Sequence, residues 1–404
     1  MTSPPPKNLP PPSGALTFLN PTLRYHPVAP DSKPPTEAVS GQPPGKPSPS
    51  PPPSGEEHPP IYHVWRSRDN RKGRHAILLP KTAAAAKHQY PPLTNTLAST
   101  GRGILKMLTS FPVWDVSYDV AIVFTLGCIV WVINGFFVWY PLAAPWSEFP
   151  GEESVGGGWT AFVGATIFEF GSVLLMLEAL NENQTDCFGW ALTSALTTLE
   201  SHTPLLRPTP TCTHHHANKH TWISPSPSPS NKPKATHKVW TWSLPLSSFK
   251  HHLHSTSFLA SLFQLFGATV FWISGFTALP FISSRLSTSV SNGIYWLPQV
   301  VGGTGFILSS IFFMLEVQTR WYRPEPGLLG WHVGFWNLVG AVGFTLCGAL
   351  GFAEGEGKGV EYALALSTFV GSWAFLVSDL FCLSWVEECR VCCERTVVNG
   401  ADCW

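Results

Sequence analysis

Charge is scarce in this chain. Only 12% of its 404 residues are Asp, Glu, Lys or Arg, a low share for a soluble protein. The formal net charge of zero hides an uneven distribution, because residues 1–60 hold 20 of the 39 prolines and residues 118–385 hold nearly all of the apolar runs. The scarcity of charge therefore argues against a wholly soluble chain.

Several signatures are missing altogether. The sequence contains no P-loop, HExxH motif, dinucleotide-binding fingerprint or nucleophile–base pair, so it predicts no enzymatic activity and no cofactor. Prolines interrupt the first fifteen residues, which lack an apolar core, so we expect no cleavable signal peptide. The nine cysteines form no pair on a side expected to face outward, which argues against a disulfide framework.

Six long apolar stretches are present instead. A membrane helix needs about 20 apolar residues to cross a hydrocarbon core of about 30 Å. Six windows meet this requirement, and we predict an all-α membrane protein with six transmembrane helices in the lipid bilayer. The windows are approximately 119–142, 158–180, 257–282, 295–317, 329–353 and 362–385.

Each stretch repeats one small motif, a glycine followed a few residues later by an aromatic side chain. Helices in lipid gain little from apolar burial, so close backbone approach at small residues holds them together. We predict that these glycines pack helices against one another. The glycines are Gly127, Gly164, Gly267, Gly302, Gly340 and Gly371, with Gly343 added in the fifth stretch, and the aromatic residues are Trp131, Phe168, Phe271, Phe306, Phe344 and Phe375.

The second and fourth stretches align without gaps, from Val163 to Glu178 and from Val301 to Glu316. Eight of the sixteen columns are identical. This repetition predicts three tandem helical hairpins, at 118–180, 256–317 and 329–385, related by an axis along the membrane normal. Glu178 and Glu316 fall at the ends of their helices, where we expect them to lie in headgroup water.

The second hairpin resembles a known domain. Its glycine pair at 302–303 and closing Met-Leu-Glu at 314–316 are similar to the YrhK-like membrane hairpin domain. The region 111–385 also resembles a family of uncharacterised fungal polytopic integral membrane proteins, notably at 111–115, 292–296 and 330–334. These resemblances imply a membrane-helical architecture and carry over no catalytic residue or substrate.

Three segments flank the hairpins. Residues 1–110 are rich in proline. This composition predicts a disordered cytosolic tail whose polyproline segments could bind cytosolic partners. Residues 181–255 predict a flexible loop rich in His, Ser and Pro, and residues 386–404 predict a cysteine-rich cytosolic tail. The basic cluster at 66–74 suits an anionic lipid surface, so we predict no nucleic-acid partner. The sequence indicates no oligomeric state.

Two groups of residues in these segments have alternative interpretations. Cys212, His214 and His216 could bind zinc or copper, or belong to a polar loop that is merely rich in histidine. Juxtamembrane cysteines are candidates for palmitoylation, with unmodified thiols as the alternative. These are Cys389, Cys392 and Cys393.

Polar residues at membrane depth are the remaining candidates. A charged group such as Glu169, near the middle of its span, costs about 2.5–3.5 kcal/mol and usually faces a bundle interior or water. Glu169, Asp379 and His332 could line a path for protons or cations. Alternatively, they and Asn134 and Gln264 form hydrogen bonds that fix the helix register, each worth roughly 0.6 kcal/mol.

Two functions follow from these interpretations. The first is a structural or regulatory membrane protein whose proline-rich tail recruits partners. The alternative is a transporter or channel for a proton, cation or small solute that uses Glu169 and Asp379.

Basic residues predict the orientation of the chain. Alternate segments between the spans hold 23 and 2 of the 25 Lys and Arg residues. Because the basic side stays in the cytosol, we predict that both termini are cytosolic.

This orientation predicts the fate of one glycosylation sequon, Asn183-Gln184-Thr185. It follows the second span on the cytosolic side, so we expect Asn183 to remain unmodified. The check is the mass of the protein from a eukaryotic host before and after glycosidase treatment. A glycosidase-sensitive shift that Asn183→Gln removes would contradict the orientation.

Overall fold

The structure is a computed structural model that describes residues 11–27, 62–71, 76–79, 97–110, 116–182, 240–243, 249–395 and 397–399. These ranges contain six helical segments long and apolar enough to cross a membrane, which confirms the prediction of a six-helix integral membrane protein. The segments are Val116–Ala143, Glu152–Leu180, Thr256–Thr277, Thr288–Val317, Leu329–Gly351 and Lys358–Leu383.

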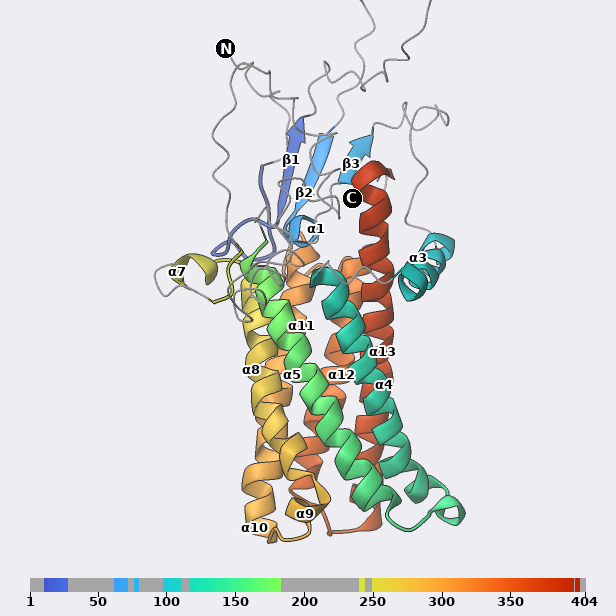
Figure 1. Ribbon diagram of the computed structural model, residues 1–404. Helices are drawn as coiled ribbons and strands as arrows, with labels where there is room; N and C mark the ends of the chain where they lie inside the picture. The colour runs from blue at the N-terminus through green and yellow to red at the C-terminus, as the bar shows by residue number, and fades with distance from the viewer. Residues whose placement is uncertain are drawn as a thin grey trace, which may run out of the picture.

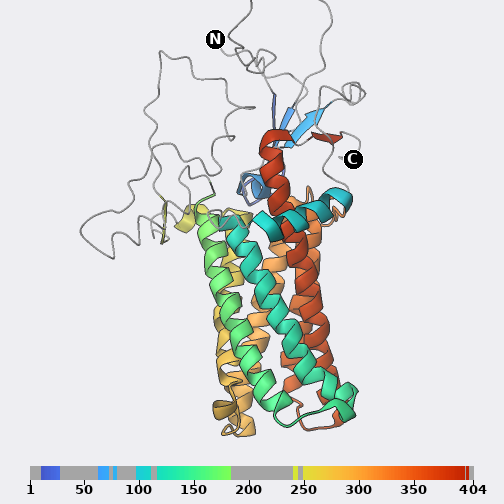
Figure 2. The ribbon, with the colours of Figure 1, turned by 45° about the vertical axis from the view of Figure 1, so that its right-hand side comes forward.

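The six segments form a closed ring, a bundle that Figures 1 and 2 show from the side. Each helix packs extensively against the next in sequence, and the last packs against the first. This order is consistent with three tandem hairpins, α4–α5, α8–α11 and α12–α13. The helices are α4 (Val116–Ala143), α5 (Gly158–Leu180), α8 (Thr256–Thr277), α11 (Leu297–Val317), α12 (Leu329–Gly351) and α13 (Lys358–Arg395).

Short elements complete the membrane segments and their turns. The π-helical segment η2 (Glu152–Gly157) leads into α5, and α10 (Thr288–Ser291) and the π-helical segment η3 (Asn292–Trp296) lead into α11. The 3-10 segment η1 (Pro145–Ser147) and α9 (Pro280–Ser283) lie between spans. Ser255 caps α8 by accepting a hydrogen bond from the Phe258 amide. Gly151 adopts a left-handed conformation with φ of 84°, which glycine tolerates without strain.

A small sheet stands at one end of the bundle, which we call the α1 end because the short helix α1 (Ser67–Arg71) lies there (Figure 1). The sheet has the order β1-β2-β3-β4. Its first three strands pair antiparallel, and β4 runs parallel to β3. The helix α3 (Leu97–Ser110) packs against α13 and crosses it (Figure 2). The strands are β1 (Leu23–Pro27), β2 (Tyr62–Arg66), β3 (Ala76–Leu79) and β4 (Val397–Asn399).

These elements refine the predicted flanking segments. The prediction of a disordered tail over 1–110 is too broad for the described segments, in which β1 and β2 pair their backbones and α1 packs on the bundle. Within the predicted cysteine-rich tail at 386–404, α13 continues to Arg395 and β4 follows. The loop 181–255 is anchored at its ends, since Asn181 exchanges two side-chain hydrogen bonds with the backbone of Thr241. Residues 28–61 and 183–239 lie outside the described residues.

Glycines and aromatic residues of the repeated motif pack reciprocally within every hairpin. A Cβ added at one of these glycines would lie 2.7–3.1 Å from the motif aromatic of the partner helix, closer than ordinary van der Waals contact. Only glycine therefore allows this approach, as the sequence predicted. The pairs are Gly127–Phe168 and Gly164–Trp131 in the first hairpin, Gly267–Phe306 and Gly302–Phe271 in the second, and Gly340–Phe375 and Gly371–Phe344 in the third. Gly343 also packs on α13, near Ser367 and Gly371.

The six motif aromatics fill the middle of the ring as two triads. Trp131, Phe271 and Phe344 come from the first helix of each hairpin, and their ring centroids are 4.9–5.8 Å apart. The second helices supply the other triad, with centroids 5.8–6.4 Å apart, namely Phe168, Phe306 and Phe375. Each triad takes one residue from each hairpin, as an approximate threefold axis along the bundle requires.

The packing predicts opposite results for two glycines of the fourth membrane segment. In Gly302→Ala, the new Cβ would meet the Phe271 backbone at 2.8 Å and the Gly267 carbonyl oxygen at 2.7 Å. We expect Gly302→Ala to lose stability, because overpacking costs about 1–3 kcal/mol and the better helix propensity of alanine returns at most roughly 1 kcal/mol. Thermal unfolding in detergent measures the difference. Gly293→Ala is the matched control and should not lose stability, since a Cβ added there would meet no neighbouring atom within 4 Å. Equal stability of the two variants would contradict the packing argument.

Candidate functional site

Glu169 is half-buried where α5 meets α8, on the outer side of the ring. Its Oε1 accepts a 3.0 Å hydrogen bond from Thr269, and within the described residues its Oε2 has no partner. A second contact crosses the same helix interface, where Trp272 Nε1 donates to Thr166 Oγ1 at 3.0 Å. These bonds join the first hairpin to the second.

The other intramembrane candidates lie at different interfaces. Asp379 of α13 accepts a 2.9 Å hydrogen bond from the Cys128 thiol of α4. His332 Nε2 lies 2.8 Å from the Pro326 carbonyl oxygen, near the start of α12. Among the hydrogen bonds of the described residues, none joins any two of Glu169, Asp379 and His332.

Asn134 and Gln264 are buried. The Asn134 amide donates to the Gly157 carbonyl at 2.7 Å and to Thr160 at 2.9 Å, which links α4 to the start of α5. The Oε1 of Gln264 has no hydrogen-bond partner among the described residues. The contacts of Asn134, Glu169 and Asp379 each connect neighbouring helices, as residues that fix the helix register would do.

The centre of the ring is closed. The six motif aromatics, with Ala165 and Ala268, surround a cavity of only about 10 Å³. A water molecule needs roughly 10–15 Å³ and two to four polar partners, and this lining is apolar. The bundle axis therefore carries no chain of water past the two triads.

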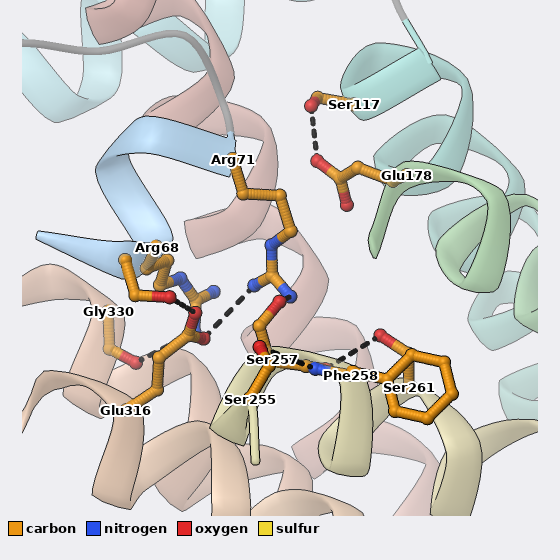
Figure 3. A network of polar contacts seen from close by, with 11 residues as sticks. Arg68, Arg71, Ser117, Glu178, Ser255, Ser257, Phe258, Ser261, Glu316 and Gly330 are labelled. Atoms are coloured by element: carbon orange, nitrogen blue, oxygen red, sulfur yellow. Dashed lines mark hydrogen bonds and ion pairs between the residues drawn. The ribbon is translucent and has the colours of Figure 1, made fainter. Parts of the chain in front are cut away.

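The polar chemistry gathers at the α1 end, where Glu178 and Glu316 are buried. They are 2% and 1% exposed. The prediction that both lie in headgroup water is wrong, because segments distant in sequence cover them. Ser117 donates a hydrogen bond to Glu178 Oε1 (Figure 3). We call the region around Glu178, Glu316 and Ser257 the mouth.

Arg71 of α1 enters this mouth (Figure 3). Its Nη2 lies 3.1 Å from Glu316 Oε2, with the two side chains 1% and 0% exposed. Its Nη1 donates to the Ser257 hydroxyl, and Ser67 donates to the other oxygen of Glu316 at 3.1 Å. One guanidinium thus joins α1 to both helices of the second hairpin.

A second arginine and an aromatic ring complete the mouth. The guanidinium carbons of Arg68 and Arg71 lie 5.6 and 5.7 Å from the centroid of Phe313, within cation–π range. Arg68 Nη1 also donates to the Gly330 carbonyl at the start of α12, at 3.4 Å. The segment Ser67–Arg71 therefore contacts the second and third hairpins together.

Electrostatics favour the charged state of Arg71. Desolvation by burial is the largest single effect and acts to lower the pKa of this guanidinium, but the negative charges nearby, led by Glu316 and Glu178, together outweigh it, and the net pKa is raised above its ordinary value. A planar, permanently charged fork suits a buried carboxylate better than an ammonium does. The mouth is therefore a site that holds a guanidinium.

The remaining candidates fall outside this geometry. Cys212, His214 and His216 lie outside the described residues, as do the side chains of Cys389, Cys392 and Cys393. The metal and lipidation hypotheses therefore stay predictions.

Comparisons with known proteins do not extend these observations. No family model, curated protein or solved structure matches the chain.

Sequence reasoning missed the pairing at the mouth, although one signal was present. Glu178 and Glu316 occupy the same column of the repeat, and a matched acidic residue in two membrane hairpins indicates a shared role. In the sequence alone, the cluster at 66–74 shows only net positive charge. Nothing local to Arg71 indicates a partner 245 residues away.

The buried ion pair at the mouth predicts a large loss of stability for one isosteric substitution. In Glu316→Gln, the charge of Arg71 loses its buried counterion, and removing one partner of such a pair typically costs about 3–5 kcal/mol. We expect a fall in unfolding free energy of that order, measured by thermal or chemical unfolding of the purified protein in detergent. Glu356→Gln, at an exposed residue, should change stability by less than about 0.5 kcal/mol. If Glu316→Gln loses no more unfolding free energy than Glu356→Gln, Arg71 and Glu316 do not form a buried pair.

Proposed function

We propose that this integral membrane protein is a structural or regulatory component of its membrane. One observation carries the proposal: the two aromatic triads close the bundle axis around a cavity of about 10 Å³. A protein that conducts solutes needs a continuous polar route in at least one state, and the reciprocal glycine–aromatic packing offers none along the axis. A rigid ring that presents flanking segments at one end suits a scaffold.

The proposal includes an orientation. We place the α1 end, with both termini, in the cytosol, because 23 of the 25 Lys and Arg residues fall in segments of that side. In this orientation the proline-rich N-terminal region is available to cytosolic partners. We assign the protein no enzymatic activity and no nucleic-acid partner, since the sequence offers no catalytic fingerprint. The relationship to YrhK-like hairpins and to the fungal membrane family remains part of this proposal.

The alternative is a transporter or channel that uses Glu169 and Asp379. Its support is the carboxyl group of Glu169, whose Oε2 has no hydrogen-bond partner among the described residues. Against it stands the placement of the two acids, since one lies at the α5–α8 interface and the other at the α13–α4 interface. A route between them would have to pass through the aromatic triads or along lipid.

Flux measurements distinguish the two functions. The purified protein is reconstituted in liposomes that hold a proton or potassium gradient and report it with an entrapped dye. We expect the gradient to decay as slowly as in protein-free liposomes, because the sealed axis gives ions no path. Glu169→Gln and Asp379→Asn are the matched controls and should behave like the unsubstituted protein. Faster decay that either substitution abolishes would establish the transporter instead.

A further inference from the structure

The internal repeat places the same polar pair in two hairpins. Ser117 and Ser257 each lie ten residues before the motif glycine of the first helix, and Glu178 and Glu316 share a column of the second helix. Both pairs are buried at the α1 end. The third hairpin has Gly330 and Trp385 in these columns. A serine–glutamate pair is therefore a feature of hairpins one and two.

The two pairs adopt different arrangements. In the first hairpin, Ser117 donates directly to Glu178. In the second, Arg71 stands between the partners, since it donates from Nη1 to Ser257 and from Nη2 to Glu316 (Figure 3). The same two residue types in the same repeat positions thus show a direct arrangement and one bridged by a guanidinium.

The second pair is built for a planar cation. Glu316 supplies the charge, Ser257 supplies a hydroxyl acceptor, and the ring of Phe313 lies 5.7 Å from the guanidinium carbon. Glu178 adds negative charge nearby, as its effect on the pKa of Arg71 indicates. Nη1 and Nη2 lie along one edge of the planar guanidinium and donate to the two acceptors together, whereas an ammonium carries all of its donors on one nitrogen and lacks this fixed spacing.

The ligand in this site belongs to a short helix of five residues, Ser67–Arg71. Ser67 and Arg68 of the same helix also bind the bundle, through Glu316 and the Gly330 carbonyl. A buried ion pair contributes little net stability, because desolvation offsets the Coulomb attraction. The first hairpin shows an arrangement open to the second when Arg71 leaves, in which the serine donates directly to the glutamate. Two such arrangements of one site would meet the requirement for a switch.

We propose that Ser257 and Glu316 form a guanidinium-binding site whose resident ligand is Arg71 of the same chain, and that the pair closes on itself when α1 withdraws. Release of α1 would withdraw the guanidinium from the mouth and leave Ser257 and Glu316 paired with each other. This site at the mouth does not depend on whether the bundle is a structural component or a transporter.

Chemical rescue tests the site in the full-length protein in detergent. Arg71→Ala removes the guanidinium, and methylguanidinium chloride is the probe. We expect the substitution to lower the unfolding temperature and millimolar methylguanidinium to restore more than half of the loss. Methylammonium chloride at equal concentration should restore little, because it lacks the planar fork. The double variant Arg71→Ala/Glu316→Gln should show no rescue.

Two outcomes would overturn the proposal. One is an Arg71→Ala protein that methylguanidinium leaves unchanged. The other is equal rescue by methylammonium or in the double variant, which would indicate a general salt effect. Arg320→Ala, at an exposed arginine, is the control and should not respond to the probe.

A second measurement applies if Arg71→Ala does not fold. Asp69, on α1, is 7% exposed. In Asp69→Cys, labelling by a water-soluble maleimide reports release of α1, with the unsubstituted chain supplying the background. We expect methylguanidinium to compete with Arg71 and raise the labelling rate at least twofold. A rate independent of methylguanidinium would contradict an exchangeable ligand.

Discussion

Close packing of glycine against aromatic rings is the interaction on which this structure depends. Helices surrounded by lipid gain little from burying apolar side chains, so shape and contact distance decide which helices associate. In each hairpin, the motif glycine of one helix leaves room for the motif aromatic of the other, and the relation is mutual. Three hairpins with the same internal packing then turn their aromatics inward and meet as two triads.

The filled axis determines where polar chemistry can occur. With the centre sealed, polar side chains lie between neighbouring helices, as Asp379 does with Cys128, or at the α1 end. At that end the helices supply buried carboxylates and hydroxyls, and a segment from outside the bundle supplies the guanidinium. The mouth therefore couples the packing of the hairpins to the position of the N-terminal region.

The sequence was sufficient for the framework of this fold and insufficient for its ends. Apolar length and glycine spacing predicted six helices, three hairpins and the packing role of residues such as Gly302, because these depend on local composition. Burial of Glu316 could not be predicted in this way. Hydropathy places a residue along its helix, but what covers the helix end depends on a segment 245 residues away. For the same reason, the sequence shows Arg71 only as one charge of a basic cluster.

The most direct test of this account is whether the first and last membrane helices touch and close the ring. A Cβ on Gly135 of α4 would lie 3.3 Å from the Cβ of Phe369 of α13, near the roughly 3.8 Å that a disulfide prefers. The double variant Gly135→Cys/Phe369→Cys should therefore cross-link on mild oxidation in membranes. Cleavage at a protease site inserted within 224–230 should leave the two halves joined until reductant is added. The pair Gly135→Cys/Ile273→Cys, with its second position facing lipid on α8, should not cross-link. Failure of the 135–369 pair in a protein that still inserts and folds would contradict the closed ring.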